Sequence, residues 1–238
     1  MQRRTLQRLL TIWMTFALCF AALPAQAVRT PKEEELIATV TLASEPGKAV
    51  ELETLGTVTS LVRVDGQTRE IPTAELVFGE NVPMEKRVAV VRATRTGQAT
   101  MHSVKSVKSY TVMYKVPCGT IVGVVKTGSK YTRIVYKGKL GYVLTAALEY
   151  LSPASTPLGR GTISLYGKAT GKTEINIRGS GSHYSRIITS WKTASEVLVW
   201  AKEKDFYEVE FNGVRGWVQE KFLTCAFETS AVSADSSP

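Results

Sequence analysis

The fold is decided by residues 206–223, FYEVEFNGVRGWVQEKFL. The first six residues alternate apolar with charged or polar side chains, a pattern typical of a half-buried β-strand whose polar side faces solvent. Asn212 and Gly213 both tolerate the positive φ of a type I′ turn, so the strand should turn back at this point. Trp217 begins the return strand. The stretch therefore predicts a β-hairpin.

This stretch recurs twice earlier in the chain, at residues 59–76 and 131–148. In each copy a turn glycine precedes a leucine by ten residues; the pairs are Gly66 and Leu76, Gly138 and Leu148, and Gly213 and Leu223. A spacing that appears three times indicates an internal repeat. Because β-branched and aromatic residues are frequent around the later copies, strands are favoured over helices. We therefore expect an all-β protein, with single helical turns only at 145–148 and 220–222.

The third copy carries a family resemblance. Residues 175–181, INIRGSG, followed by Tyr184, are similar to the L-N-V-R-S-G-P-S…Y opening of bacterial SH3-like domains. The Trp217-Val218 pair and the leucine ten residues after the turn resemble the end of the same domains. The resemblance implies a small SH3-like β-barrel in this part of the chain.

The resemblance is good over 162–225, fair over 87–151 and weak over 36–78. In the second copy, 101–103 stand where 175–177 stand in the third. The resemblance implies tandem small SH3-like β-barrels, the first of them divergent. The predicted divisions are a signal peptide at 1–27, a divergent SH3-like unit with its linker at 28–86, a basic SH3-like domain at 87–151, a linker at 152–161, an SH3-like domain at 162–225 and a disordered tail at 226–238.

Residues 1–27 are predicted to direct export. Their first part carries arginines, an apolar run follows, and Ala25-Gln26-Ala27 is a small-x-small cleavage site. The mature protein is therefore expected in the periplasm or outside the cell. Of its two cysteines, Cys118 and Cys225, the exported compartment permits a disulfide, and the alternative is two free thiols.

No motif indicates catalysis, a metal or a cofactor. The chain has two histidines and lacks His-x-x-x-His, Cys-x-x-Cys and Gly-x-Ser-x-Gly motifs. Cys118 could be considered as a nucleophile, but the sequence signals neither a helix N-terminus nor a paired histidine beside it. The sequence thus predicts a protein that is not an enzyme.

The resemblance implies an exported binding or scaffold protein that recognises a peptidoglycan peptide or an envelope protein. Residues 179–182 could bring backbone amides close to a ligand, and exposed aromatic residues beside them suit an extended peptide. The predicted groove lies between this loop and the turn before Trp217. The predicted ligand-binding residues are Trp217, Tyr184, Arg178, Asn176 and Tyr207. The alternative is that these aromatic residues only fill the core and its rim.

A second function is also open at this point. Residues 87–151 hold eleven basic residues and one acidic residue, Glu149, and such an excess favours an anionic partner. The candidate polyanion-binding residues are Lys105, Lys108, Lys115, Lys126, Lys130, Arg133, Lys137 and Lys139. The alternative is a solvated surface, or contact with the acidic residues of 28–86.

Overall fold

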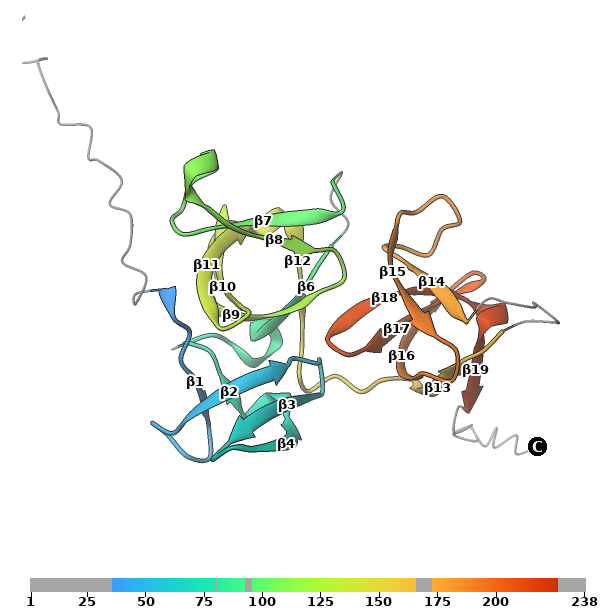
Figure 1. Cartoon of the computed structure of the whole chain (residues 1–238), viewed down its shortest axis with the longest axis horizontal. Helices are drawn as coiled ribbons and strands as arrows, with labels where there is room; N and C mark the ends of the chain where they lie inside the picture. The colour runs from blue at the N-terminus through green and yellow to red at the C-terminus, as the bar shows by residue number, and fades with distance from the viewer. Residues whose placement is uncertain (1–35, 80, 93–95, 166–172, 227–238) are drawn as a thin grey trace, which may run out of the picture. The chain divides into compact units, whose positions relative to one another are not determined.

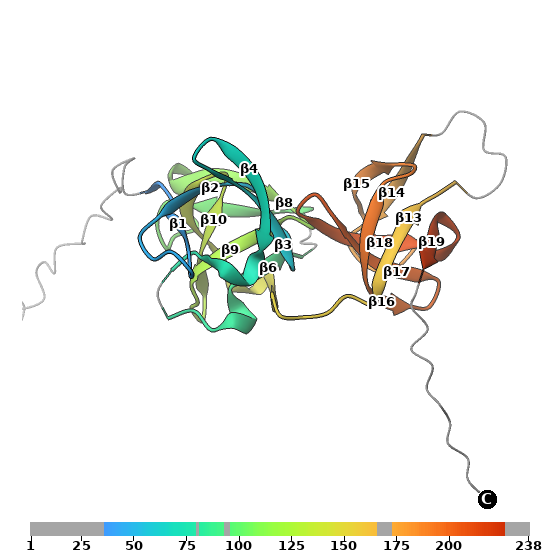
Figure 2. The same cartoon turned by 90° about the horizontal axis from the view of Figure 1, so that it is seen from below.

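The computed structural model describes residues 36–79, 81–92, 96–165 and 173–226. Over these ranges the chain forms three antiparallel β-sheets in succession, with short 3-10 turns as its helical elements (Figures 1 and 2). The all-β prediction is confirmed. The predicted signal peptide and all but the first residue of the predicted tail lie outside the described residues. Within the described part, no helix is long and apolar enough to cross a membrane.

The strands follow the chain from sheet to sheet. The first sheet contains β1 (Val40–Leu42), β2 (Ala49–Thr54), β3 (Thr59–Val64), β4 (Gln67–Pro72) and β5 (Leu76–Val77). The second contains β6 (Val88–Val91), β7 (Gln98–His102), β8 (Val112–Pro117), β9 (Ile121–Lys126), β10 (Tyr131–Tyr136), β11 (Lys139–Leu144) and β12 (Leu148–Leu151). The third contains β13 (Gly159–Ile163), β14 (Glu174–Arg178), β15 (Ile187–Lys192), β16 (Glu196–Glu203), β17 (Phe206–Phe211), β18 (Val214–Gln219) and β19 (Leu223–Ala226). The 3-10 turns are η2 (Thr73–Glu75), η3 (Met84–Lys86), η4 (Ser109–Thr111), η5 (Thr145–Ala147) and η6 (Glu220–Phe222).

Each repeated stretch forms the predicted hairpin. Its return strand leads into a 3-10 turn (η2, η5 or η6) and then into a strand that begins with the repeated leucine. The ten-residue spacing therefore spans one return strand and one helical turn, and the turns predicted at 145–148 and 220–222 are confirmed. In each of the three repeated hairpins both turn residues have positive φ; the pairs are Asp65 (52°) and Gly66 (80°), Lys137 (50°) and Gly138 (67°), and Asn212 (48°) and Gly213 (71°).

The second and third sheets share one strand order. It is β8-β7-β11-β10-β9-β6-β12 in the second and β15-β14-β18-β17-β16-β13-β19 in the third. The first sheet, β4-β3-β2-β1-β5, matches the last five strands of that order. It lacks the outer hairpin, which is β7–β8 in the second sheet and β14–β15 in the third. Residues 43–48 alone connect β1 to β2, whereas 92–120 connect β6 to β9, so the first copy has no room for it. Each order ends at edge strands, so the predicted barrels are open sheets.

The pairing also corrects the alignment of the copies. Tyr142 pairs with His102 in the second sheet, and Trp217 pairs with Arg178 in the third. His102 therefore corresponds to Arg178, two residues later than the sequence comparison placed it. In both sheets a β-bulge immediately precedes this position.

The first sheet shares its core with the second. Val62 and Leu76 of the first sheet belong to the same buried cluster as Val88 and Val90 of β6, while the residues between them on β6 face the second sheet's own core. The second sheet thus has two apolar faces. The linker predicted at the end of the 28–86 unit is packed as well where it contains Val82, which is buried in the second sheet's core.

Strand β17 is buried on both faces, which contradicts the half-buried strand predicted from its alternating pattern. Glu208 and Glu210 are each only 5% exposed. Glu208 pairs with Arg92 of the loop that follows β6, at 2.6 Å, and Glu210 accepts hydrogen bonds from Thr57 in the first sheet's β2–β3 connection. Glu208 and Glu210 therefore alternate with the apolar residues of β17 because their side chains contact the other two sheets.

Candidate functional site

Two of the predicted ligand-binding residues, Arg178 and Trp217, are brought together on the neighbouring strands β14 and β18. Nη1 of Arg178 donates a hydrogen bond of 2.6 Å to the carbonyl oxygen of Ser185, so the guanidinium group holds the 179–186 loop. The same loop lies against the indole, because a Cβ placed on Gly181 would come within 3.2 Å of the Trp217 ring. The loop thus lies against the ring that was predicted to form one wall of the groove.

The other three predicted residues differ in their burial and contacts. Tyr184 is 99% exposed. Asn176 is also exposed, and its Oδ1 accepts a hydrogen bond of 3.0 Å from Ser190. Tyr207 is 7% exposed and packs in the core of the third sheet. This burial contradicts its predicted contact with a ligand.

His183, to which sequence reasoning gave no role, attaches the loop to the hairpin. Its Nδ1 lies 3.0 Å from Nε2 of Gln219, and its Nε2 lies 2.9 Å from Oδ2 of Asp205. Because the Gln219 amide nitrogen can only donate, Nδ1 accepts and Nε2–H donates to the carboxylate. The ring also meets Phe206 edge-on at 4.9 Å. With both nitrogens engaged, His183 is a tether and has no free lone pair to act as a base.

The predicted polyanion-binding residues come from several strands and loops of the second sheet. Several lie over tyrosine rings, as Lys105 and Arg133 do over Tyr142, each at 5.8 Å from the ring centroid. Lys108, Lys130 and Lys137 lie over Tyr110, Tyr131 and Tyr136, respectively. Lys115 donates to the hydroxyl of Thr100 at 2.9 Å, Lys126 ends β9, and Lys139 bridges to Ile37 through the backbone.

Cys118 and Cys225 are both free thiols, so the predicted disulfide is not formed. Cys118 is buried in the core of the second sheet, where its Sγ donates to the carbonyl oxygen of Arg92. Cys225 packs against the core of the third sheet. The two residues belong to different hydrophobic cores, which explains why they are not joined.

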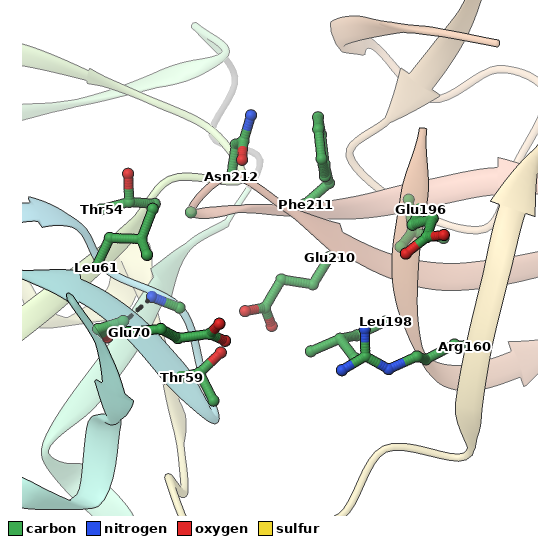
Figure 3. Close-up of a pocket in the computed structure, with 14 residues that line it drawn as sticks. Thr54, Thr59, Leu61, Glu70, Arg160, Glu196, Leu198, Glu210, Phe211 and Asn212 are labelled. Carbon is green, nitrogen blue, oxygen red and sulfur yellow. Dashed lines mark hydrogen bonds between the residues drawn. The ribbon is translucent and has the colours of Figure 1, made fainter. Parts of the chain in front are cut away.

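A cleft of about 240 Å³ lies between the first and third sheets (Figure 3). Figure 3 shows Glu210 reaching from β17 into this cleft, toward the strands that carry Thr59 and Glu70. Arg160 and Glu196 line the opposite side. Three carboxylates and one guanidinium thus meet in one cleft, which the sequence pattern did not reveal because the residues come from separate repeats.

The carboxylate of Glu210 is held by two hydrogen bonds from one residue. The backbone N–H of Thr57 donates to Oε1 at 2.7 Å, and its hydroxyl donates to Oε2 at 2.6 Å. Burial nevertheless raises the pKa of Glu210, against the hydrogen bonds from Thr57 and the charge of Arg215. A carboxyl group with a raised pKa keeps its proton to a higher pH and can serve as an acid. Because both oxygens already bind Thr57, the group's structural role is to join the first sheet to the third.

We expect Glu210 to make stability depend on pH. Since its folded-state pKa is raised, the stability it contributes is fully present below about pH 4.5, its unfolded value, and is lost as pH rises through the folded value. We therefore expect the free energy of unfolding of the wild type, measured with urea, to fall relative to that of Glu210→Gln as the pH rises from 4.5 to 7.5. Glu196→Gln, an exposed residue of the same cleft, is the control. A difference that stays flat across this range would contradict the expectation.

No group of three or more histidine, cysteine or acidic side chains is placed to hold a metal ion within the described ranges.

Comparison with known proteins gives one informative match. No protein-family model matches the chain. A stretch of 134 residues is 30% identical to a putative N-acetylmuramoyl-L-alanine amidase, YrvJ, of Bacillus subtilis. The match covers 54% of this chain and 25% of the amidase, so the chain spans about a quarter of that relative.

Two solved structures, NlpC2 and NlpC1 from Trichomonas vaginalis, align with 61% and 62% of this chain and with 50% and 49% of their own. Their sequence identities are 15% and 14%, and both TM-scores are 0.26. The match to the amidase contradicts the predictions of a non-enzymatic binding or scaffold protein and of a protein that is not an enzyme. The same match contradicts the polyanion-binding alternative. This chain is therefore similar, over about half its length, to part of a putative cell-wall amidase.

Proposed function

We propose that the protein takes part in peptidoglycan hydrolysis, in the class of N-acetylmuramoyl-L-alanine amidases. The observation that carries the proposal is the 30% identity over 134 residues to a putative enzyme of that name. Its substrate is then the amide bond between a muramoyl group and a peptide, and its place is the exported or envelope compartment. The predicted signal peptide agrees with this location.

Within that activity, we assign the three sheets to holding the wall polymer. The shared strand order, the glycine-to-leucine spacing and the single 3-10 turn before the last strand support a relation to bacterial SH3-like domains. In the third sheet, Trp217 and Arg178 are the residues proposed to contact the wall. The partly exposed indole of Trp217 is a suitable surface for an extended peptide or a sugar ring.

The test uses the full chain and purified sacculi. Hydrolysis is measured as newly exposed peptide amino groups, and binding as protein that sediments with the wall. We expect both. Binding without release of amino groups would contradict the hydrolase class, and neither binding nor release would remove the whole proposal.

A matched pair of variants tests the wall contact. Loss of an aromatic anchor typically costs about 2 kcal/mol or more of binding, so Trp217→Ala should sediment far less than the wild type. Tyr184→Ala is the comparison, because Tyr184 lies on the loop next to Trp217 but is fully exposed. Melting temperatures of both variants separate lost binding from lost stability. If Trp217→Ala melts near the wild type and still sediments fully, the third sheet does not hold the wall through this residue.

A further inference from the structure

A second cavity, of about 430 Å³, opens on the second sheet. Its lining comes from the β7–β8 hairpin and from Leu144 and Ala147 at the two ends of the η5 segment. It is larger than the cleft of Figure 3 and lies within one sheet. Its volume is within the range of small-ligand pockets.

His102 presents an unpaired nitrogen to this cavity. The hydroxyl of Thr111 donates to the carbonyl oxygen of Lys108 at 2.7 Å, so its single proton is used. Thr111 Oγ1 must then accept the 2.8 Å hydrogen bond from Nδ1–H of His102. The remaining nitrogen, Nε2, makes no hydrogen bond within the described residues. His102 is 5% exposed and lines the cavity, so a ligand would reach Nε2 from inside it.

The imidazole is held neutral. Burial lowers the pKa of His102, and the positive charge of Lys115 lowers it further. Nε2 therefore carries a lone pair at neutral pH and can accept one hydrogen bond. The β-bulge between Met101 and His102 is the kind of irregularity that turns a side chain away from the strand's regular alternation.

Lys115 supplies the cavity's positive charge. Its ammonium group is positioned by the hydroxyl of Thr100, which also lines the cavity. No carboxylate lines the cavity, and within the described residues Lys115 has no ion-pair partner. The acidic residue of this region, Glu149, is paired with Arg92. Lys115 is thus a cation without an internal counter-ion.

Aliphatic side chains form an open part of the wall, and Thr96, Gln98 and Ser109 add polar groups to the lining. Val107 is 64% exposed, and Val112 and Leu144 are also exposed although they line the cavity. Large aliphatic side chains grouped around a cavity are typical of a ligand-binding surface. The site thus combines an imidazole acceptor, one cation and aliphatic side chains.

We infer that this cavity binds the carboxyl-terminal residue of a peptide with a small aliphatic side chain, or an N-acylated amino acid of that kind. The carboxylate pairs with Lys115, the amide N–H donates to Nε2 of His102, and the side chain packs against Val107, Val112 and Leu144. Such a ligand is bound whether or not the protein hydrolyses peptidoglycan.

The probe is N-acetylalanine in both configurations. Its binding is monitored through the NMR signals of the two histidine side chains of the full chain. In the free protein, His102 should show the Nδ1–H tautomer. Addition of N-acetylalanine should shift the His102 signals and leave those of His183 in place, which makes His183 an internal control. N-acetylalaninamide, which lacks the carboxylate, should bind at least about ten-fold more weakly, because it loses a charged hydrogen bond.

Two variants complete the test. Lys115→Met should remove the preference for the carboxylate, whereas Lys126→Met, an exposed lysine outside the cavity, should keep it. His102→Asn can still donate to Thr111, but its shorter side chain has no acceptor at the position of Nε2, so binding should fall about ten-fold or more with the fold retained. If His102→Asn unfolds, Lys115→Met decides alone. Equal shifts by acid and amide, unchanged binding in Lys115→Met, or no shift of His102 at tens of millimolar probe would each overturn the inference.

Discussion

Replacing Glu208 with alanine is expected to lower the free energy of unfolding by about 3–5 kcal/mol, the range for breaking a buried ion pair by removing one partner. Its carboxylate is 5% exposed and pairs with Arg92 at 2.6 Å and with Arg215 at 2.8 Å. Arg215 is itself buried and lies over the Trp200 ring at 4.3 Å. Without Glu208 its guanidinium would remain buried without its ion-pair partner.

Urea unfolding measures this loss, with Glu174→Ala as the control. Glu174 is an exposed glutamate of the same sheet, and its removal should change stability by no more than about 0.5 kcal/mol. A double-mutant cycle with Arg92→Ala then isolates the contact between the second and third sheets. If Glu208→Ala and Glu174→Ala lower the free energy of unfolding by equally small amounts, the ion pairs of Glu208 with Arg92 and Arg215 do not hold the sheets together.

The local parts of this fold could be predicted from the sequence. Each hairpin depends on a turn pair that tolerates positive φ and on the residues next to it, so a short window contains the information. The same holds for the 3-10 turns, which follow at a fixed distance in all three copies. These features are encoded within about twenty residues, and the repeat displays them three times.

Contacts between copies could not be predicted in this way. The pattern of β17 gave the correct strand but the wrong environment, because a charged residue that alternates with apolar ones looks the same whether it meets water or an arginine from another sheet. Arg92 is 116 positions from Glu208, and Thr57 is 153 positions from Glu210. The cleft of Figure 3 depends on such distant pairs, so no single motif indicated it.

Some buried polar contacts repeat and could have been found. In the first sheet the hydroxyl of Thr73 donates to the carbonyl oxygen of Gly56 and contacts Ser60. In the second, Thr145 donates to Gly128 and contacts Thr132 at the same separations along the chain. The signal is a glycine, a hydroxyl residue four positions later and a threonine thirteen beyond that. In the third sheet Glu220 stands at the threonine's place, which hides the motif there.

The sequence pattern also could not show that the first two copies share a core. Strand β6 is buried along its whole length, and an unbroken apolar run of this kind indicates a strand covered on both sides. Its two sides face two different cores, because the short first sheet lacks an outer hairpin and closes its core against the second. The first two copies therefore form one packed body, although the repeat suggests two.

This shared core leads to the second large expected effect. Phe78 is 5% exposed, belongs to the shared cluster, and lies so close to Gly123 of β9 that a Cβ there would come within 2.5 Å of its ring. Phe78→Ala should cost about 3–5 kcal/mol, through lost burial and the cavity left behind. Leu158→Ala, at a site that is 55% exposed, is the control and should cost little.

Hydrogen exchange distinguishes a shared core from two independent ones. In Phe78→Ala, amides of β3 in the first sheet and of β9 in the second should lose protection together, since both strands contribute to the same cluster. If the first sheet folded on its own, only its amides would exchange faster and β9 would keep wild-type protection. That outcome would show that the packing of Phe78 on Gly123 does not couple the two sheets energetically.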